Sequence, residues 1–180
     1  MGRTLKEGGR DLEVKVLNVL KERIAVHGDR AEIVQAEWNG RPLDILAAEL
    51  THFGERMDRC LGEYSFEPVP GDPDGAKYFR AVITLRDEIA LERVPGLAFA
   101  LSFLNFYLET GCFALNKPSD LLIFKNTRTF PGDTPEEILV KDAVLLMEEA
   151  YETAARYAAP VLSLAEGSME TAEFLELIRT

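Results

Sequence analysis

The sequence predicts an α+β domain in which an antiparallel sheet is combined with an N-terminal helix, a central buried helix and a long C-terminal helix. Three observations lead to this prediction. The almost wholly apolar segment Val94 to Leu108 has the length of a helix and ends before Gly111. The segment Cys112 to Phe130 then has the pattern of a hairpin, and a new helix is expected from Thr134. Helices and strands in this order indicate one shared core.

The first predicted element is an amphipathic helix from about Arg10 to His27, which ends at Gly28. Its apolar residues recur at helical spacing: Leu12, Val16, Leu20 and Ile24. Residues 1–9 carry charge and three glycines and are expected to form a flexible tail. A chain of 180 residues fits one ordinary domain, so residues 10–180 are interpreted as a single α+β domain.

A hairpin is predicted next, because Glu32 to Trp38 alternates polar and apolar residues before Asn39-Gly40. The return strand, Leu43 to Phe53, is apolar on both faces, and one of these faces carries Leu46, Ala48 and Leu50. Such a strand is expected to need cover on both sides. A short strand from Tyr64 to Val69 and an amphipathic strand from Tyr78 to Asp87 complete the first half.

The segment Val94 to Leu108 contains no charged residue, so its apolar surface extends around the whole helix. The sheet of one chain covers one face of such a helix, and we expect other helices or a second copy of the chain to cover the rest. The sequence therefore predicts a homodimer. The candidate interface or groove residues are Leu46, Ala48, Leu50, Phe106 and Tyr107. Asn105, a polar residue of this helix, is expected either to bond to a neighbouring loop or to line a small pocket with Phe99 and Tyr107.

The last elements are clearly delimited. Residues 116–119 have the composition of a turn, and Thr134-Pro135-Glu136-Glu137 has the pattern of a capping box. Pro160 is expected to kink the long helix and Gly167 to end it, before a short helix from about Glu170 to Ile178. The predicted buried side of the long helix comprises Ile138, Leu145, Leu146, Ala150, Ala154 and Tyr157.

Composition limits the classes of function. A net charge of −11 opposes nucleic-acid binding, and no apolar run approaches the ~20 residues that cross a bilayer. The absence of a signal-peptide pattern predicts a cytoplasmic protein, in which Cys60 and Cys112 are expected to remain reduced.

No catalytic or metal-binding constellation stands out. His52, Asp58 and Cys60 do not have the spacing of a zinc site, and Ser102 lacks the glycines of a nucleophile elbow. The carboxylates Asp72 and Asp74 lie in a turn-forming segment. The sequence thus predicts a protein that is not an enzyme and has no catalytic residues, cofactor or metal. A hydrolase that uses acidic residues is the least favoured alternative.

Five segments carry a resemblance to a known family: Leu101-Ser102-Phe103-Leu104-Asn105, Gly111-Cys112-Phe113-Ala114-Leu115, Leu121 to Phe124, Thr134-Pro135-Glu136-Glu137, and Leu164-Ala165-Glu166-Gly167. In their order and spacing the chain resembles the YbjN-like family of bacterial sensory transduction regulators. The resemblance implies the fold of type III secretion chaperones. It also implies a dimeric, cofactor-free domain that binds other proteins as a regulator or chaperone-like adaptor.

The function expected from these observations is a non-catalytic protein-binding or chaperone-like regulatory adaptor, which acts as a homodimer and binds another protein through an exposed sheet or groove. The alternative is a small-molecule sensor with a pocket between the sheet and the buried helix, in which Asn105 is the polar group.

Overall fold

The structure is a computed structural model that describes residues 7–38, 40–54, 57–72, 74–116 and 120–179, without the side chains of residues 7–9, 38 and 52. Within these ranges the chain is an α+β protein with four helices and one sheet of six strands. In chain order the elements are α1 (Glu7–Val26), β1 (Arg30–Trp38), β2 (Arg41–Phe53), β3 (Met57–Pro68), β4 (Lys77–Arg86), α2 (Val94–Tyr107), β5 (Cys112–Asn116), β6 (Leu121–Phe130), α3 (Glu136–Glu166) and α4 (Thr171–Leu177).

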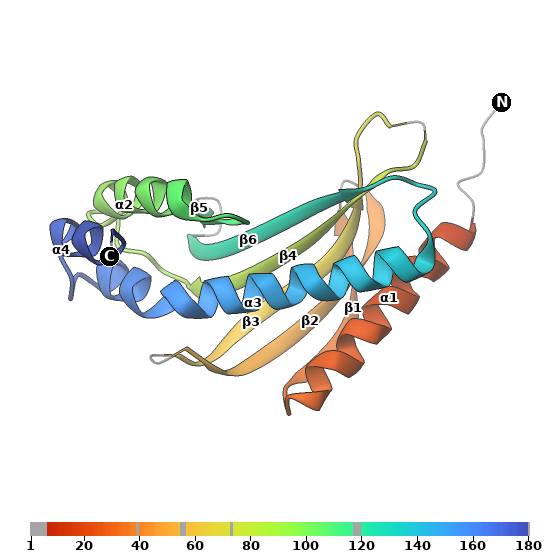
Figure 1. Cartoon of the computed structure of the whole chain (residues 1–180), viewed down its shortest axis with the longest axis horizontal. Helices are drawn as coiled ribbons and strands as arrows, with labels where there is room; N and C mark the ends of the chain where they lie inside the picture. Colours follow the sequence, from red (N-terminus) through yellow and green to blue (C-terminus); the bar gives the residue numbers. More distant parts are fainter. Residues whose placement is uncertain (1–6, 39, 55–56, 73, 117–119, 180) are drawn as a thin grey trace.

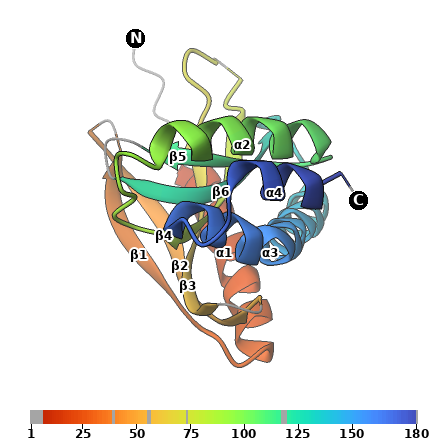
Figure 2. The same cartoon turned by 90° about the vertical axis from the view of Figure 1, so that its left-hand side faces the viewer.

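The sheet is antiparallel throughout and has the order β1-β2-β3-β4-β6-β5. Helix α3 runs along the sheet, and α1 lies on the same face as α3 (Figure 1). Helices α2 and α4 gather at the end of the molecule where β5 lies, as both views show (Figures 1 and 2). The core fills the space between the sheet and the helices, and its largest fully buried side chains include Phe53, Tyr64, Phe79, Phe113, Phe124 and Phe174.

The apolar stripe of α1 forms as predicted, because Val16, Leu20 and Ile24 are buried against the sheet layer. The helix begins at Glu7, so part of the expected tail is helical, while residues 1–6 lie outside the described part. The hairpin of β1 and β2 is also confirmed, since Trp38 pairs with Arg41.

The assignment of Leu46, Ala48 and Leu50 to an interface is wrong. These side chains are 0 to 3% exposed in a single copy of the chain. They belong to the buried core cluster of the protomer, together with buried residues of α1 and α3. The opposite face of β2, which carries Leu43 and Ile45, is partly exposed. Alternation along a strand defines two faces, but it does not reveal which of them the helices cover.

Strand β3 is longer than predicted, because it begins at Met57 and not near Tyr64. Gly62 interrupts the apolar pattern in the sequence, yet it pairs with Ala48 and Ile83 inside the sheet. The turn predicted at residues 116–119 falls mostly on residues 117–119, which lie outside the described part.

Helix α2 buries one side only. Leu97, Ala100, Leu101 and Leu104 are buried, whereas Phe99, Phe106 and Tyr107 are exposed. The expectation of a helix buried on most sides therefore does not hold within one copy of the chain.

The ends of α3 were predicted in part. Gly167 ends the helix in the left-handed conformation, with its N–H bonded to Leu164 O. The capping box at Thr134 is wrong, because the Thr134 hydroxyl donates to Pro131 O at 2.7 Å and the helix begins at Glu136. Pro160 lies inside the continuous helix.

The buried side of α3 was also predicted incorrectly in part. Leu146, Ala150 and Ala154 are buried as predicted, whereas Ile138 and Leu145 are exposed. Leu139, which the prediction did not include, is buried. Among the helices of the described ranges, none is both long and apolar enough to cross a membrane.

Candidate functional site

The open sheet has two edge strands, β1 with 9 residues and β5 with 5. An edge strand presents backbone N–H and C=O groups to which another chain can add a strand. What surrounds each edge therefore decides where an extended segment can bind.

A side chain of α2 covers the edge of the sheet at Phe113 of β5. Asn105 Nδ2 donates to Phe113 O at 2.9 Å, and Asn105 Oδ1 accepts from Phe113 N at 2.8 Å. Both backbone groups of Phe113 therefore bond to the carboxamide, which occupies the place that a further strand would take. Both polar atoms of Asn105 are used in this contact, so the residue acts as a cover for the edge. The pocket expected around Asn105 is not formed by this side chain.

The edge at β1 is open. Trp38 pairs with Arg41, and in an antiparallel register every second pair of residues exchanges hydrogen bonds. Pro42, which has no N–H, lies opposite Glu37 at a position where none is required. Strand β1 is the outermost strand of the sheet, as Figure 2 shows. The residues whose backbone N–H and C=O groups point away from β2 in this register are Ala31, Ile33, Gln35 and Glu37.

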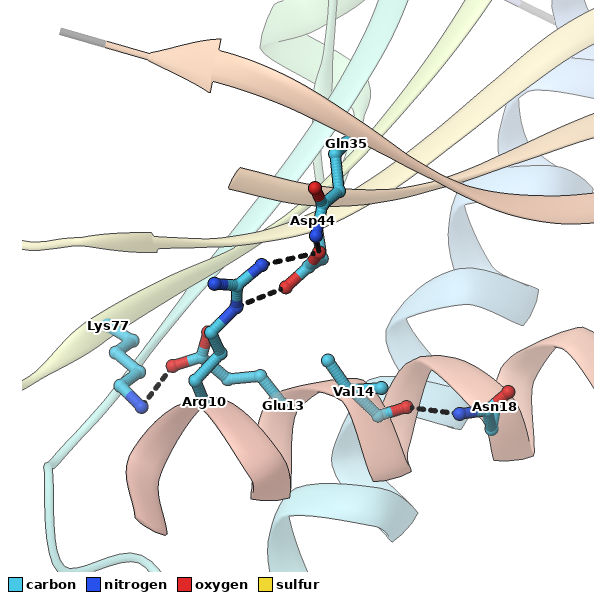
Figure 3. Close-up of polar contacts among 7 residues, drawn as sticks. All are labelled: Arg10, Glu13, Val14, Asn18, Gln35, Asp44 and Lys77. Carbon is cyan, nitrogen blue, oxygen red and sulfur yellow. Dashed lines mark hydrogen bonds and ion pairs between the residues drawn. The ribbon is translucent and has the colours of Figure 1, made fainter. Parts of the chain in front are cut away.

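A groove of about 530 Å³ lies between α1 and this open edge. Arg10 on α1, Gln35 on β1 and Asp44 on β2 meet in it (Figure 3). Arg10 Nε donates to Asp44 Oδ2 at 2.8 Å, and Arg10 Nη2 donates to Asp44 Oδ1 at 3.1 Å. Gln35 Nε2 donates to the same Oδ1 at 3.4 Å. Val14 and Ile33 add an apolar part to the lining.

Two ion pairs hold the first half of α1 on the sheet. Arg10 donates to both carboxylate oxygens of Asp44 through Nε and Nη2, and Lys77 on β4 pairs with Glu13 (Figure 3). The Asp44 side chain is only 10% exposed, and its hydrogen bond with Arg10 holds the pKa of this carboxyl below its usual range. Burial raises the pKa of Glu13, although Lys77 acts in the opposite direction. These pairs fix the helical wall of the groove.

The Arg10–Asp44 pair gives a testable dependence of stability on pH. Because the pKa of Asp44 is lower in the folded protein than in the unfolded chain, its stabilising effect is complete above the unfolded value and is lost as pH falls through the folded value. We expect Asp44→Asn to lower the free energy of unfolding at pH 7, and this loss to shrink progressively as the pH falls below the unfolded pKa of about 4. Urea denaturation between pH 2.5 and 7 measures this difference. The exposed Asp133→Asn serves as the control, and equal losses at all pH values would contradict the assignment.

The exposed face of α2 is a second surface. Phe106 is 82% exposed and Tyr107 is 51% exposed, and their rings meet edge to face at 5.3 Å. Phe99 packs against Phe103 at 5.1 Å on the same helix. Two of the five candidate interface residues, Phe106 and Tyr107, are therefore available to a partner.

The groups considered for chemistry have structural roles. Asp72 accepts the N–H groups of Asp74 and Ala76 at 3.0 and 2.7 Å and so organises its own loop. Burial raises the pKa of the Cys60 thiol to about 12, which keeps it protonated at neutral pH. In the part of the chain that the structure describes, no group of three or more His, Cys, Asp or Glu residues could hold a metal ion.

The sequence indicates one of these sites but not the other. Asn105 stands out as a polar residue in an apolar helix, whereas no sequence pattern predicts the groove at β1. Its parts, Arg10 and Asp44, lie 34 residues apart, and no local pattern connects them.

Comparisons of the chain with protein-family models, with curated proteins and with solved structures found no match.

Proposed function

We propose that the protein is a non-catalytic binding module that takes up an extended segment of another polypeptide as a further strand beside β1. The observation that carries this proposal is the contrast between the two edges of the sheet. Asn105 closes one edge with two hydrogen bonds, whereas four residues of β1 present their backbone groups outward. A protein that avoided strand addition altogether would be expected to cover both edges.

The groove beside β1 supports a preference for certain segments. Side chains alternate in direction along an added strand, so every second one would face α1 and meet Val14 and Ile33. The remaining side chains would lie beside the partly exposed outer face of the sheet, near Val34. The net charge of −11 favours a segment of net positive charge. The proposed ligand is therefore an extended basic segment with apolar residues at alternate positions.

We further propose a chaperone-like fold of the YbjN-like type, a regulatory or adaptor role, a cytoplasmic location and a homodimer. For the dimer we propose that a second copy binds the exposed aromatic face of α2, formed by Phe99, Phe106 and Tyr107. This helix carries no charge, so two strongly acidic copies can approach each other there without bringing like charges together.

A proline substitution tests strand addition without breaking the sheet. The Gln35 N–H points away from β2, so Gln35→Pro removes a donor for an added strand and leaves the β1–β2 hydrogen bonds intact. Peptides selected from a random dodecapeptide display library on the wild-type protein are expected to bind Gln35→Pro at least about tenfold more weakly, as measured by fluorescence anisotropy.

Gln35→Thr is the matched control, because it removes the same side chain but keeps the N–H in a residue that favours strands. The selected peptides are expected to bind this variant like the wild type. Equal loss in both variants would assign the effect to the Gln35 side chain, and unchanged binding to Gln35→Pro would rule out strand addition at β1.

A further inference from the structure

A second cavity, of about 540 Å³, lies at the other end of α1 and is independent of the peptide groove. Arg23, Ile24 and His27 from the last turn and end of α1 form one wall. Leu50 and Thr51 of β2 contribute to another. Side chains of α3 complete it, namely Met147, Glu148, Tyr151 and Glu152. The volume lies within the usual range of small-molecule sites, about 300 to 1,000 Å³.

Carboxylates dominate the charge of this cavity. Asp29, Glu148 and Glu152 line it, against Arg23 as the lining residue with a permanent positive charge. Arg23 is already bound to Glu148 at 2.9 Å. Neither Asp29 nor Glu152 has an ion pair with any residue of the described ranges. Asp29 Oδ1 accepts the N–H and the hydroxyl of Thr51 at 2.8 and 2.6 Å, and these two bonds leave Oδ2 unused.

Two tyrosines supply aromatic surface in the same cavity. Tyr64 is 1% exposed and lines the cavity from β3. Burial raises the pKa of Tyr64, and the nearby Cys60 and Asp29 add to the rise, so the phenol stays neutral. Tyr151 packs edge to face on Phe53 at 5.2 Å, which fixes the direction of its ring.

Strand β3 leaves space for the Tyr64 ring at Gly62. A Cβ atom on Gly62 would lie 3.0 Å from the Tyr64 hydroxyl and 3.0 Å from Leu50 Cδ1. Because Gly62 has no side chain, the Tyr64 ring can lie over the strand and reach the cavity. The cavity also lies at the carboxyl end of α1, where the helix dipole is negative.

We infer that this cavity binds a small organic cation, an amine with an apolar body. The carboxylates of Asp29 and Glu152 attract the ammonium group, and the ring of Tyr151 adds cation–π attraction. Ile24, Leu50 and Met147 receive the apolar body. An anionic ligand would meet three carboxylates and a single arginine, so its binding is disfavoured.

Three probes of similar shape and different charge test the inference: 2-phenylethylamine, 2-phenylethanol and 3-phenylpropanoate. We expect the amine to raise the melting temperature of the full-length protein with concentration and to bind with a Kd of ~1 mM or less by calorimetry. The alcohol and the acid are expected to have no effect at the same concentrations. Equal effects of all three probes would overturn the inference. The absence of any effect of the amine at concentrations up to ~10 mM would overturn it as well.

Two sets of variants locate the binding site. Asp29→Asn keeps the acceptor for Thr51 and removes the charge, and it is expected to weaken amine binding by about tenfold or more. Asp133→Asn makes the same change outside the cavity and is expected to have no effect. Tyr151→Phe keeps the aromatic ring and is expected to keep the affinity, whereas Tyr151→Leu stays apolar without a ring and is expected to lose affinity. If Asp29→Asn fails to fold, the Tyr151 pair decides, and equal affinity of those two variants would contradict the cation–π site.

Discussion

Asn105→Leu is expected to lower the free energy of unfolding by about 2 to 4 kcal/mol. The substitution keeps most of the side-chain volume but leaves Phe113 N–H and C=O without the partners that Asn105 supplies at 2.8 and 2.9 Å. The Phe113 N–H and C=O lie between α2 and β5, so the leucine side chain at position 105 also keeps water from bonding to them in place of the Asn105 carboxamide. Urea denaturation monitored by circular dichroism measures the loss, and amide exchange at Phe113 should accelerate more than exchange in β2 or β3.

Ser102→Leu is the matched control on the same helix. The Ser102 hydroxyl is exposed and donates only to Phe99 O of its own helix, so this change is expected to alter stability by no more than about 0.5 kcal/mol. Unchanged stability of Asn105→Leu would show that the carboxamide does not cover the edge of β5. The contrast between a closed and an open edge would then lose its basis.

Leu46→Ala and Phe106→Glu are expected to change two different quantities. Leu46 is 0% exposed beneath the helices, so its truncation should lower the free energy of unfolding by about 2 to 5 kcal/mol at any protein concentration. Phe106 is 82% exposed, so its replacement should change the stability of the protomer by no more than about 0.5 kcal/mol. Denaturation of both variants at several concentrations measures the difference.

The mass of the protein in solution tests whether Phe106 lies in a dimer interface. The wild type is expected to have about twice the chain mass of 20.1 kDa by light scattering at micromolar concentration, and Phe106→Glu is expected to have the mass of one chain. Leu46→Ala should remain dimeric wherever it is folded. A wild-type mass of one chain would contradict the proposed role of α2, and a monomeric but folded Leu46→Ala would return Leu46 to the interface.

The elements with strong local signals could be predicted from the sequence. The stripe of α1 needs only the spacing of Val16, Leu20 and Ile24, and the β1–β2 hairpin follows from alternation around a two-residue turn. Gly167 adopts the left-handed conformation that ends α3, and α4 lies within the predicted range, with Phe174 buried. These features depend on short stretches of chain, so local physics determines them.

Features that depend on distant neighbours could not be predicted. The two apolar faces of β2 look alike in sequence, and only the positions of α1 and α3 show that Leu46 is internal. The predicted buried side of α3 was too wide, because Leu145 and Leu146 are both apolar but only Leu146 is buried. Thr134 has the identity of a capping residue, but its hydroxyl bonds to Pro131 instead.

The candidate site could also be predicted only in part. Asn105 could be singled out as a polar group in need of a partner, but its partner, Phe113, follows from the way α2 packs on β5. The groove needs Arg10, Gln35 and Asp44 to meet from three elements, and it appears only when α1 is placed across the β1–β2 hairpin. Sequence patterns therefore single out Asn105, whereas the groove depends on tertiary packing.

Site-resolved amide hydrogen exchange with a selected peptide tests the open edge most directly. The outward amides of Ile33, Gln35 and Glu37 are expected to exchange more slowly when the peptide is bound, while Phe113 N–H, already held by Asn105, should not change. Protection confined to alternate residues of β1 is what strand addition predicts. Protection on α2 or β5, with β1 unchanged, would contradict it.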